Sequence, residues 1–256
     1  MLPYVEHPVL DLGFYRLDSF VVLTGAAIVV QYAVTMQRAP KQGIDRRTAS
    51  SLLVWAIVLG LIGARLFDVI AYTPERLAED PFEIFRIWGG ISSFGGMLGG
   101  LLGLYLVMRA KAMSRADMLR FVDCLLYALP FTLAIGRLGC ALQHDHPGIS
   151  SEHWLAVAFP DGGRFDLGLL EFFYDALLAA LFFLLGRRRW PDGFFIGLFF
   201  ALYGPVRFAL DSLRVSETRY FDWTPGQYLS IFAALIGVWT LAVVLRPGEP
   251  RPKAGS

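Results

Sequence analysis

The most unusual polar segment of the chain is GRLGCALQHDHPG, residues 136–148, in which Arg137 stands between two glycines. The polar side chains that follow are Gln143, His144, Asp145 and His146. A histidine beside a carboxylate can act as a general base near neutral pH. We therefore predict acid–base chemistry from His144, Asp145 and His146. Two other interpretations stay open: a polar cap on a helix end, and an H-x-H metal site whose third ligand the sequence does not fix.

Nine ionisable residues lie within strongly apolar stretches, where a charge is costly in lipid and is a functional candidate by default. They are Asp18, Arg65, Asp68, Asp123, Arg137, Glu171, Asp175, Arg207 and Asp211. Arg65 and Asp68 are three residues apart. Arg207 and Asp211 are four apart, so each pair can meet on one helix face. Such pairs either neutralise each other and pin helices together, or offer arginines to an anionic head group, since a guanidinium grips phosphate with two bonds.

The elements that must position these residues are apolar helices. Hydrophobic residues make up 55% of the 256 and charged residues only 18%, which is too few for a water-soluble surface. The net charge of +1 gives no case for nucleic acid as a partner. Apolar runs long enough to cross a bilayer predict an all-α, polytopic membrane protein. We expect seven spans, at about 18–36, 50–72, 95–110, 118–136, 168–186, 193–211 and 225–245, in one transmembrane domain (1–246) with a disordered tail (247–256).

The orientation of these spans follows from the basic residues of the alternating loops. The segments after the first, third, fifth and seventh spans, counted with the span ends beside them, hold 14 Lys and Arg, and the opposite set holds seven. Because basic loops stay in the cytoplasm, we expect the N-terminus outside and the C-terminus inside. Eight of the nine intramembrane charges then fall in the outer leaflet, and only Asp123 lies on the cytoplasmic side. A purely structural role would not require that bias.

Four segments resemble, in order, the motifs of the prolipoprotein diacylglyceryl transferase family. FRIWGGISSFGGMLGG is similar to the stretch F-R-x-W-x-G-G-M-S-F-H-G-G, and DCLLYALPFTLAIGRLG is similar to the signature that ends in G-R-x-G-N. GLFFALYGPVRFALDSLR resembles the helix G-x-Y-G-x-x-R-x-x-x-E-x-x-R, and WTPGQYLSI resembles the motif M-G-Q-x-L-S. The match is spread over most of the chain.

The resemblance implies an enzyme of the bacterial inner membrane that passes the diacylglyceryl group of phosphatidylglycerol to the lipobox cysteine of a prolipoprotein, whose signal peptide stays in the membrane. Glycerol phosphate leaves. Arg137 and Arg207 match family arginines that would hold the lipid phosphate and stabilise the charge of the leaving group. Substrate contacts are expected from Arg65, Gly136, Gly139, Glu171, Asp211, Arg214 and Gln227. No cofactor and no metal is expected.

The chain departs from the family pattern at positions that matter for thiol chemistry. Phe94 stands where the family has histidine, and Cys140 stands where it has asparagine. Asp145 takes an acidic family position, while His144 and His146 are additions. One explanation is an active transferase whose base function has moved to His144 or His146.

Two rival interpretations remain. A paralogue that keeps the lipid site can use another acceptor, and a protein that has lost its chemistry can be a lipid-binding or transport protein. A transporter is the weaker of these, since no internal repeat is present and the charges lie in one leaflet. Cys140 is either a carrier of a transient covalent lipid or, as is commoner for a buried cysteine, a packing residue.

Overall fold

Apolar runs bounded by polar capping residues form the long helices of the chain. The computed structural model describes residues 1–5, 9–11, 16–86, 90, 92–215 and 218–246. The long helices are α1 (Ser19–Arg38), α2 (Arg46–Phe67), α4 (Ser93–Ala110), α5 (Arg115–Gln143), α6 (Leu167–Leu185), α7 (Phe194–Asp211) and α8 (Pro225–Val244). Side chains of Asp18, Ser114 and Asp166 accept backbone N–H groups at the starts of α1, α5 and α6. The predicted tail 247–256 lies outside the described residues.

Short elements fill the connections between these helices. They are η1 (Ala39–Gln42), η2 (Asp68–Tyr72), α3 (Pro74–Glu79), η3 (Pro81–Phe85), β1 (Val9–Asp11), β2 (Arg16–Asp18), β3 (Pro147–Ser150), β4 (Val157–Phe159) and β5 (Gly162–Asp166). β1 pairs with β2, and β5 lies between β3 and β4, all antiparallel. The fold is therefore mostly helical, and the all-α prediction missed these strands. These strands lie beyond the ends of the apolar helices, where their pairing supplies hydrogen-bond partners for the backbone N–H and C=O groups.

Six of the described helices are long and apolar enough to cross a membrane. The seventh predicted span corresponds to α4, whose apolar stretch, Phe94–Ala110, is shorter. Large apolar side chains on the outside of the bundle remain exposed, among them Val29, Leu177 and Trp239, each about two-thirds or more accessible. A surface of this kind requires an apolar solvent. The chain is therefore a polytopic membrane protein.

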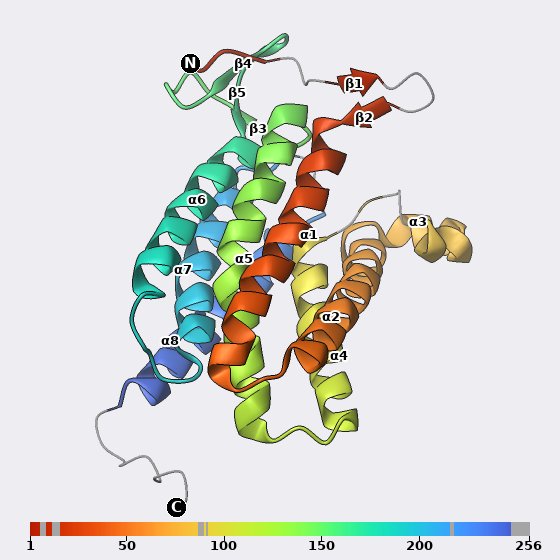
Figure 1. Ribbon diagram of the computed structural model, residues 1–256. Helices are drawn as coiled ribbons and strands as arrows, with labels where there is room; N and C mark the ends of the chain where they lie inside the picture. Colours follow the sequence, from red (N-terminus) through yellow and green to blue (C-terminus); the bar gives the residue numbers. More distant parts are fainter. Residues whose placement is uncertain (6–8, 12–15, 87–89, 91, 216–217, 247–256) are drawn as a thin grey trace, which may run out of the picture.

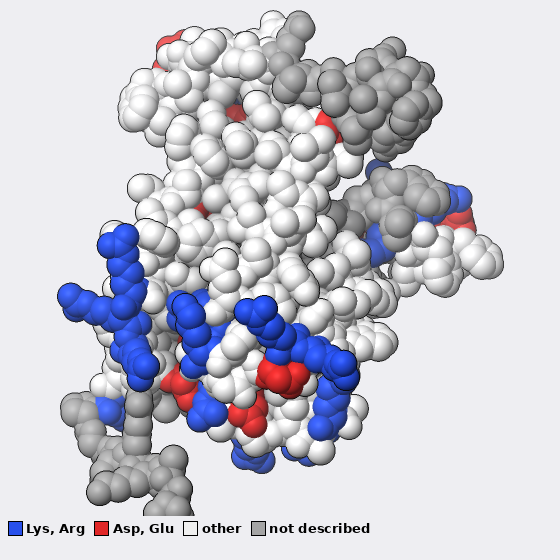
Figure 2. All heavy atoms as spheres, in the orientation of Figure 1, with Lys and Arg blue, Asp and Glu red and all other residues white. Residues whose placement is uncertain are grey.

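The strands lie at one end of the bundle, and most of the Lys and Arg side chains visible on its surface lie at the other. The strands β1 to β5 gather at one end together with the N-terminus (Figure 1). Lys and Arg side chains gather at the other end in the same view (Figure 2). Within the bundle, α2 packs chiefly against α4, α7 packs against α8, and α5 lies against both α1 and α6.

The helix α5 is longer than the sequence indicated. The predicted fourth span ends at residue 136, whereas α5 continues to Gln143 and ends at His144, whose backbone is left-handed (φ 54°). Arg137 and Cys140 are therefore helical residues and do not belong to a loop. The glycine at 139 does not break the helix but lets α1 approach, because a Cβ there would stand 3.2 Å from the Cα of Phe20. Close contact through small residues is typical of helices in lipid.

The contact between α2 and α4 depends on glycine in the same way. A Cβ on Gly63 would stand 2.5 Å from the Cα of Gly99 and 2.6 Å from the carbonyl oxygen of Gly95. Neither atom can move without displacing backbone, so a side chain would push the two helices apart. By contrast, a Cβ on Gly25 of α1 meets nothing within 4 Å.

We therefore expect Gly63→Val to destabilise the fold by about 1–3 kcal/mol, the usual cost of overpacking. Thermal unfolding of the detergent-solubilised protein measures this as a lower midpoint. Gly25→Val is the matched control and should unfold close to the wild type. Equal midpoints for the two variants would contradict the inferred close contact.

Candidate active site

One buried glutamate brings three arginines together. Glu171, near the start of α6, forms ion pairs with Arg137 of α5 (Nε–Oε2, 2.6 Å) and with Arg207 of α7. Arg214, three residues beyond α7, approaches the same carboxylate at 3.5 Å. Glu171, Arg137 and Arg207 are all less than one-tenth exposed. We call Glu171 and these three arginines the arginine cluster.

A second carboxylate orients two of these arginines. Asp211, at the end of α7, lies 3.0 Å from Arg207 and 2.9 Å from Arg214 and is completely buried. Its other oxygen accepts a hydrogen bond from the hydroxyl of Thr224. Thr224 is held by Gln227, whose side chain accepts its backbone N–H in the capping box of α8 (3.0 Å). The predicted site residue Gln227 thus reaches the arginine cluster through Thr224 and Asp211.

Two buried polar side chains face the arginine cluster with hydrogen-bonding capacity unused. Asp175 lies one turn beyond Glu171 on α6 and is 1% exposed, and it interacts electrostatically with Arg137 and Arg207. Tyr203 lies one turn before Arg207 on α7. Within the described residues, neither carboxylate oxygen of Asp175 nor the hydroxyl of Tyr203 has a hydrogen-bond partner. Buried polar groups are normally paired, so these atoms can serve a polar ligand.

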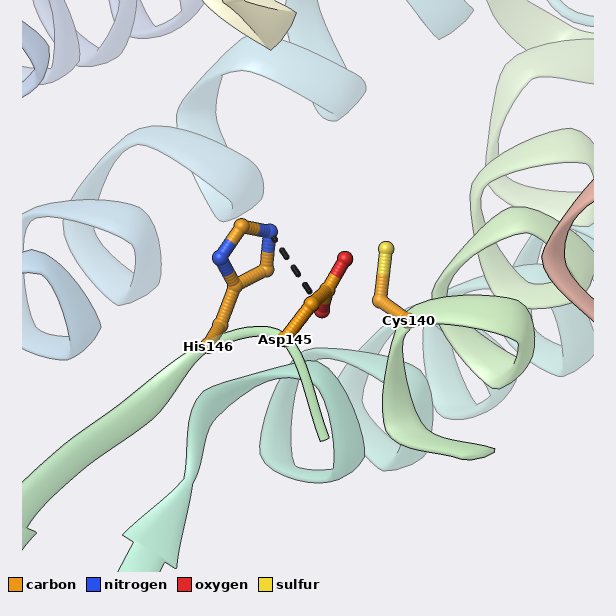
Figure 3. A group of neighbouring side chains, drawn as sticks. All are labelled: Cys140, Asp145 and His146. Atoms are coloured by element: carbon orange, nitrogen blue, oxygen red, sulfur yellow. Dashed lines mark ion pairs between the residues drawn. The ribbon is translucent and has the colours of Figure 1, made fainter. Parts of the chain in front are cut away.

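At the C-terminal end of α5, three further side chains converge (Figure 3). The ligand atoms of Cys140, Asp145 and His146 all lie within 4.8 Å of one another. His146 Nε2 is 3.7 Å from Asp145 Oδ1, and Cys140 Sγ is 4.0 Å from Arg137 Nη1. Burial raises the pKa of the Asp145 carboxyl to about 6, with Arg137 opposing the shift. Burial, reinforced by Arg214 and Arg137, lowers the pKa of His146 to about 4, so its imidazole is neutral at pH 7.

His144 is not part of this convergence, although the sequence grouped it with Asp145 and His146. Its Nδ1 lies 2.5 Å from Asp166 Oδ2, and its Nε2 lies 3.0 Å from the carbonyl oxygen of Val5. The ring of Tyr4 stacks on it at 4.3 Å. His144 therefore fastens the N-terminal segment to the start of α6, and both ring nitrogens are engaged. Its predicted acid–base role is not supported by this placement.

Asp166 is one of the residues near the site that the sequence analysis missed, as are Thr224 and Tyr203. Besides pairing with His144, it caps α6 through Leu169 N–H (3.0 Å) and is 1% exposed. The signal was present in the sequence, because an aspartate directly before an apolar run is typical of a helix N-cap.

Arg65 lies apart from the arginine cluster. Its guanidinium contacts Asp68 (3.1 Å), Glu83 (2.9 Å) and the carbonyl oxygen of Gly90 (3.1 Å). The pair with Asp68 that the spacing predicted is confirmed, and it extends to Glu83. These contacts fasten the connection between α2 and α4, and they leave the predicted substrate contact of Arg65 without support.

The two predicted glycines of α5 differ in their surroundings. A Cβ on Gly136 meets nothing within 4 Å, so space is open beside it. Gly139 packs against α1, as described above. Gly136 therefore remains a candidate for substrate contact, whereas Gly139 has a packing role.

Removing the charge of Glu171 should be strongly destabilising, because it leaves three buried guanidinium groups without their shared anion. We expect Glu171→Gln to lower the free energy of unfolding by about 3–5 kcal/mol, the usual cost of breaking a buried ion pair. Thermal unfolding in detergent measures the loss. Glu152→Gln, at an exposed position, is the control and should leave the midpoint unchanged. A midpoint for Glu171→Gln equal to that of the control would show that the cluster does not depend on this charge.

Removing the ring of His144 should free the N-terminal segment without disturbing the helices. Leu2 N–H donates to Ala156 O at 2.7 Å and marks the docked state. In His144→Ala we expect the amide of Leu2 to exchange with solvent about tenfold faster, since a hydrogen bond is worth about 1 kcal/mol or more. Hydrogen exchange detected by NMR measures this, and Arg188→Ala, which alters an exposed side chain between α6 and α7, is the control. Unchanged exchange in His144→Ala would refute the anchoring role.

Comparison with known proteins agrees with this geometry. The sequence model of the family described as prolipoprotein diacylglyceryl transferase matches residues 8–243. A phosphatidylglycerol–prolipoprotein diacylglyceryl transferase of Chromohalobacter salexigens is 28% identical over 92% of this chain and 91% of its own. One of Nitratidesulfovibrio vulgaris is 32% identical over 79% of each chain. These matches confirm the resemblance drawn from the four motifs, and the chain belongs to the prolipoprotein diacylglyceryl transferase family.

Proposed function

We propose that this protein transfers the diacylglyceryl group of phosphatidylglycerol to the lipobox cysteine of prolipoproteins. The observation that carries the proposal is the arginine cluster, in which three guanidinium groups converge at one end of an apolar bundle. Guanidinium forks match phosphate oxygens geometrically. The names of the relatives supply the donor and the acceptor.

In the proposed reaction, the arginines bind the phosphate of the lipid. The acceptor thiol loses its proton to solvent, its sulfur forms a bond to the glyceryl carbon, and the bond between that carbon and the phosphate oxygen breaks. Glycerol phosphate leaves with the bonding electrons, so negative charge grows on its phosphate. Arg137 and Arg207 stabilise this charge, and Glu171 and Asp211 hold them in place beforehand.

An apolar groove beside the cluster suits the lipid part of a substrate. The open groove has a volume of about 570 Å³ and lies between the end of α2 and the start of α8, with Phe67, Tyr220 and Tyr228 among its lining residues. It also borders Pro225, which directly follows Thr224. In this proposal, acyl chains or the apolar part of the signal peptide lie against this surface.

The proposed topology has seven spans in a bacterial inner membrane, with the N-terminus outside. The basic end of the bundle in Figure 2 supports a cytoplasmic placement of that end. The 17 apolar residues of α4 reach about 26 Å as a helix, a little short of a hydrocarbon core of about 30 Å. Its packing against α2 supports it as the remaining span. The arginine cluster then opens toward the outer leaflet.

The experiment mixes purified protein, phosphatidylglycerol micelles and a lipobox peptide, and follows peptide mass and glycerol phosphate. We expect the peptide to gain one diacylglyceryl group. Arg137→Ala and Arg207→Ala should each reduce the rate at least about 100-fold, as expected for groups that stabilise transition-state charge. Arg120→Ala removes a partly exposed arginine of the basic end and is the control.

The outcome also separates the rival functions. Release of glycerol phosphate without a mass gain would point to a different acceptor and contradict the lipobox assignment. Phosphatidylglycerol bound with neither release nor mass gain would show a lipid-binding protein and contradict the enzymatic proposal.

A further inference from the structure

The side chains of Cys140, Asp145 and His146 point toward a common space at the outer end of α5 (Figure 3). Together they offer a sulfur, an oxygen and a nitrogen atom within 4.8 Å of one another. Zinc takes this combination of ligands in proteins, at about 2.0–2.3 Å each. In a tetrahedral site such distances place neighbouring ligand atoms about 3.3–3.8 Å apart. A nitrogen–oxygen pair lies at the short end of this range, and the 3.7 Å between His146 Nε2 and Asp145 Oδ1 is within about 0.4 Å of it.

We propose that Cys140, Asp145 and His146 bind a zinc ion and leave its fourth coordination position open. Three protein ligands with an open position are the pattern of catalytic zinc sites. The set differs from the H-x-H site considered from the sequence, because His144 is engaged by Asp166 and Val5. The proposed site uses only one of the two histidines, His146. Its other ligands are Cys140, near the end of α5, and Asp145.

The local backbone holds the three ligands in place. α5 ends at Gln143, and the left-handed conformation of His144 turns the chain back over the helix end that carries Cys140. The ring of His144 is fixed by Asp166, as described above. The carbonyl oxygen of His146 accepts the N–H of Leu167 at 3.1 Å. The backbone therefore already places the three ligands, and binding of a metal would require only small movements of their side chains.

The charges of the region allow a divalent cation despite the nearby arginines. Arg137, Arg207 and Arg214 carry three positive charges, and three carboxylates lie among them: Glu171, Asp175 and Asp211. A zinc ion bound by the thiolate of Cys140 and the carboxylate of Asp145 is neutral as a unit.

The site gains a role if the proposed transfer reaction is correct, and this part of the inference rests on that proposal. The acceptor thiol would take the open position and release its proton to solvent, because a thiol that coordinates zinc is deprotonated. The resulting sulfur attacks the glyceryl carbon while the arginines hold the departing phosphate. The product is a thioether, a neutral and weaker ligand, which leaves the position open for the next acceptor.

The test uses the full chain without an affinity tag, purified in detergent, stripped with EDTA and dialysed against Zn²⁺ or Co²⁺. We expect about one ion per chain by elemental analysis. With Co²⁺ we expect the near-ultraviolet absorption of a cobalt–thiolate bond. Cys140→Ser should abolish that absorption, and Asp145→Asn, at the more accessible ligand, should weaken Zn²⁺ binding at least about tenfold. Cys124→Ser removes the other cysteine, which lies in the same helix, and should change neither result.

Each outcome decides a separate statement. Absence of bound metal, or a cobalt–thiolate absorption that survives Cys140→Ser and disappears in Cys124→Ser, overturns the site. Metal binding without diacylglyceryl transfer supports the site and contradicts the proposed function. Full transfer by the stripped protein in EDTA overturns the acceptor role of the metal and leaves the transferase intact.

Discussion

The burial of Glu171 among three arginines is the constraint on which the arrangement of α5, α6 and α7 depends. Each of these charges loses its hydration, and the mutual attraction offsets that loss only when all four are in place. Apolar residues of similar size would hold the helices together as well. The charged cluster is therefore not needed for packing alone, and the proposed anionic ligand, which would share the guanidinium groups with Glu171, gives it a function.

Contacts at the helix ends set the geometry of this cluster. Asp166, the last residue of β5, caps α6, and Glu171 lies buried five residues later. At the start of α8, the capping box of Thr224 and Gln227 places a hydroxyl on Asp211. At the opposite end, Asp123 of α5 accepts the backbone N–H of Ile196 (3.1 Å) and fixes α7. The apolar faces bring the helices together, and these polar contacts determine their register.

Hydropathy and charge spacing were sufficient to predict most of the helices and the two local pairs, Arg65 with Asp68 and Arg207 with Asp211, because both signals lie within one segment. The role of Glu171 as a shared partner was not predictable, since its arginines come from helices 34 and 36 residues away in sequence. The extension of α5 past Gly139 was missed because the glycine serves a contact with α1 that only the packing reveals. The contact of His144 with Asp166 likewise depends on the pairing of β3 with β5, which brings together residues 22 apart in sequence.

The surroundings of Phe94 bear on where the acceptor thiol is activated. Its ring lies 5.6 Å from the guanidinium carbon of Arg207 and packs against Tyr203, so this position supplies packing and no proton acceptor. Asp175, whose carboxylate oxygens have no hydrogen-bond partner among the described residues, is 1% exposed and lies deeper along α6. The side chains of Asp145 and His146 are about one-third exposed, at the end of the bundle that carries the strands. In the proposed reaction, a cysteine just beyond a membrane-embedded signal peptide would reach that end without entering the bundle. Access therefore favours the proposed activation at Cys140, Asp145 and His146, of which Cys140 lies about one helical turn from Arg137.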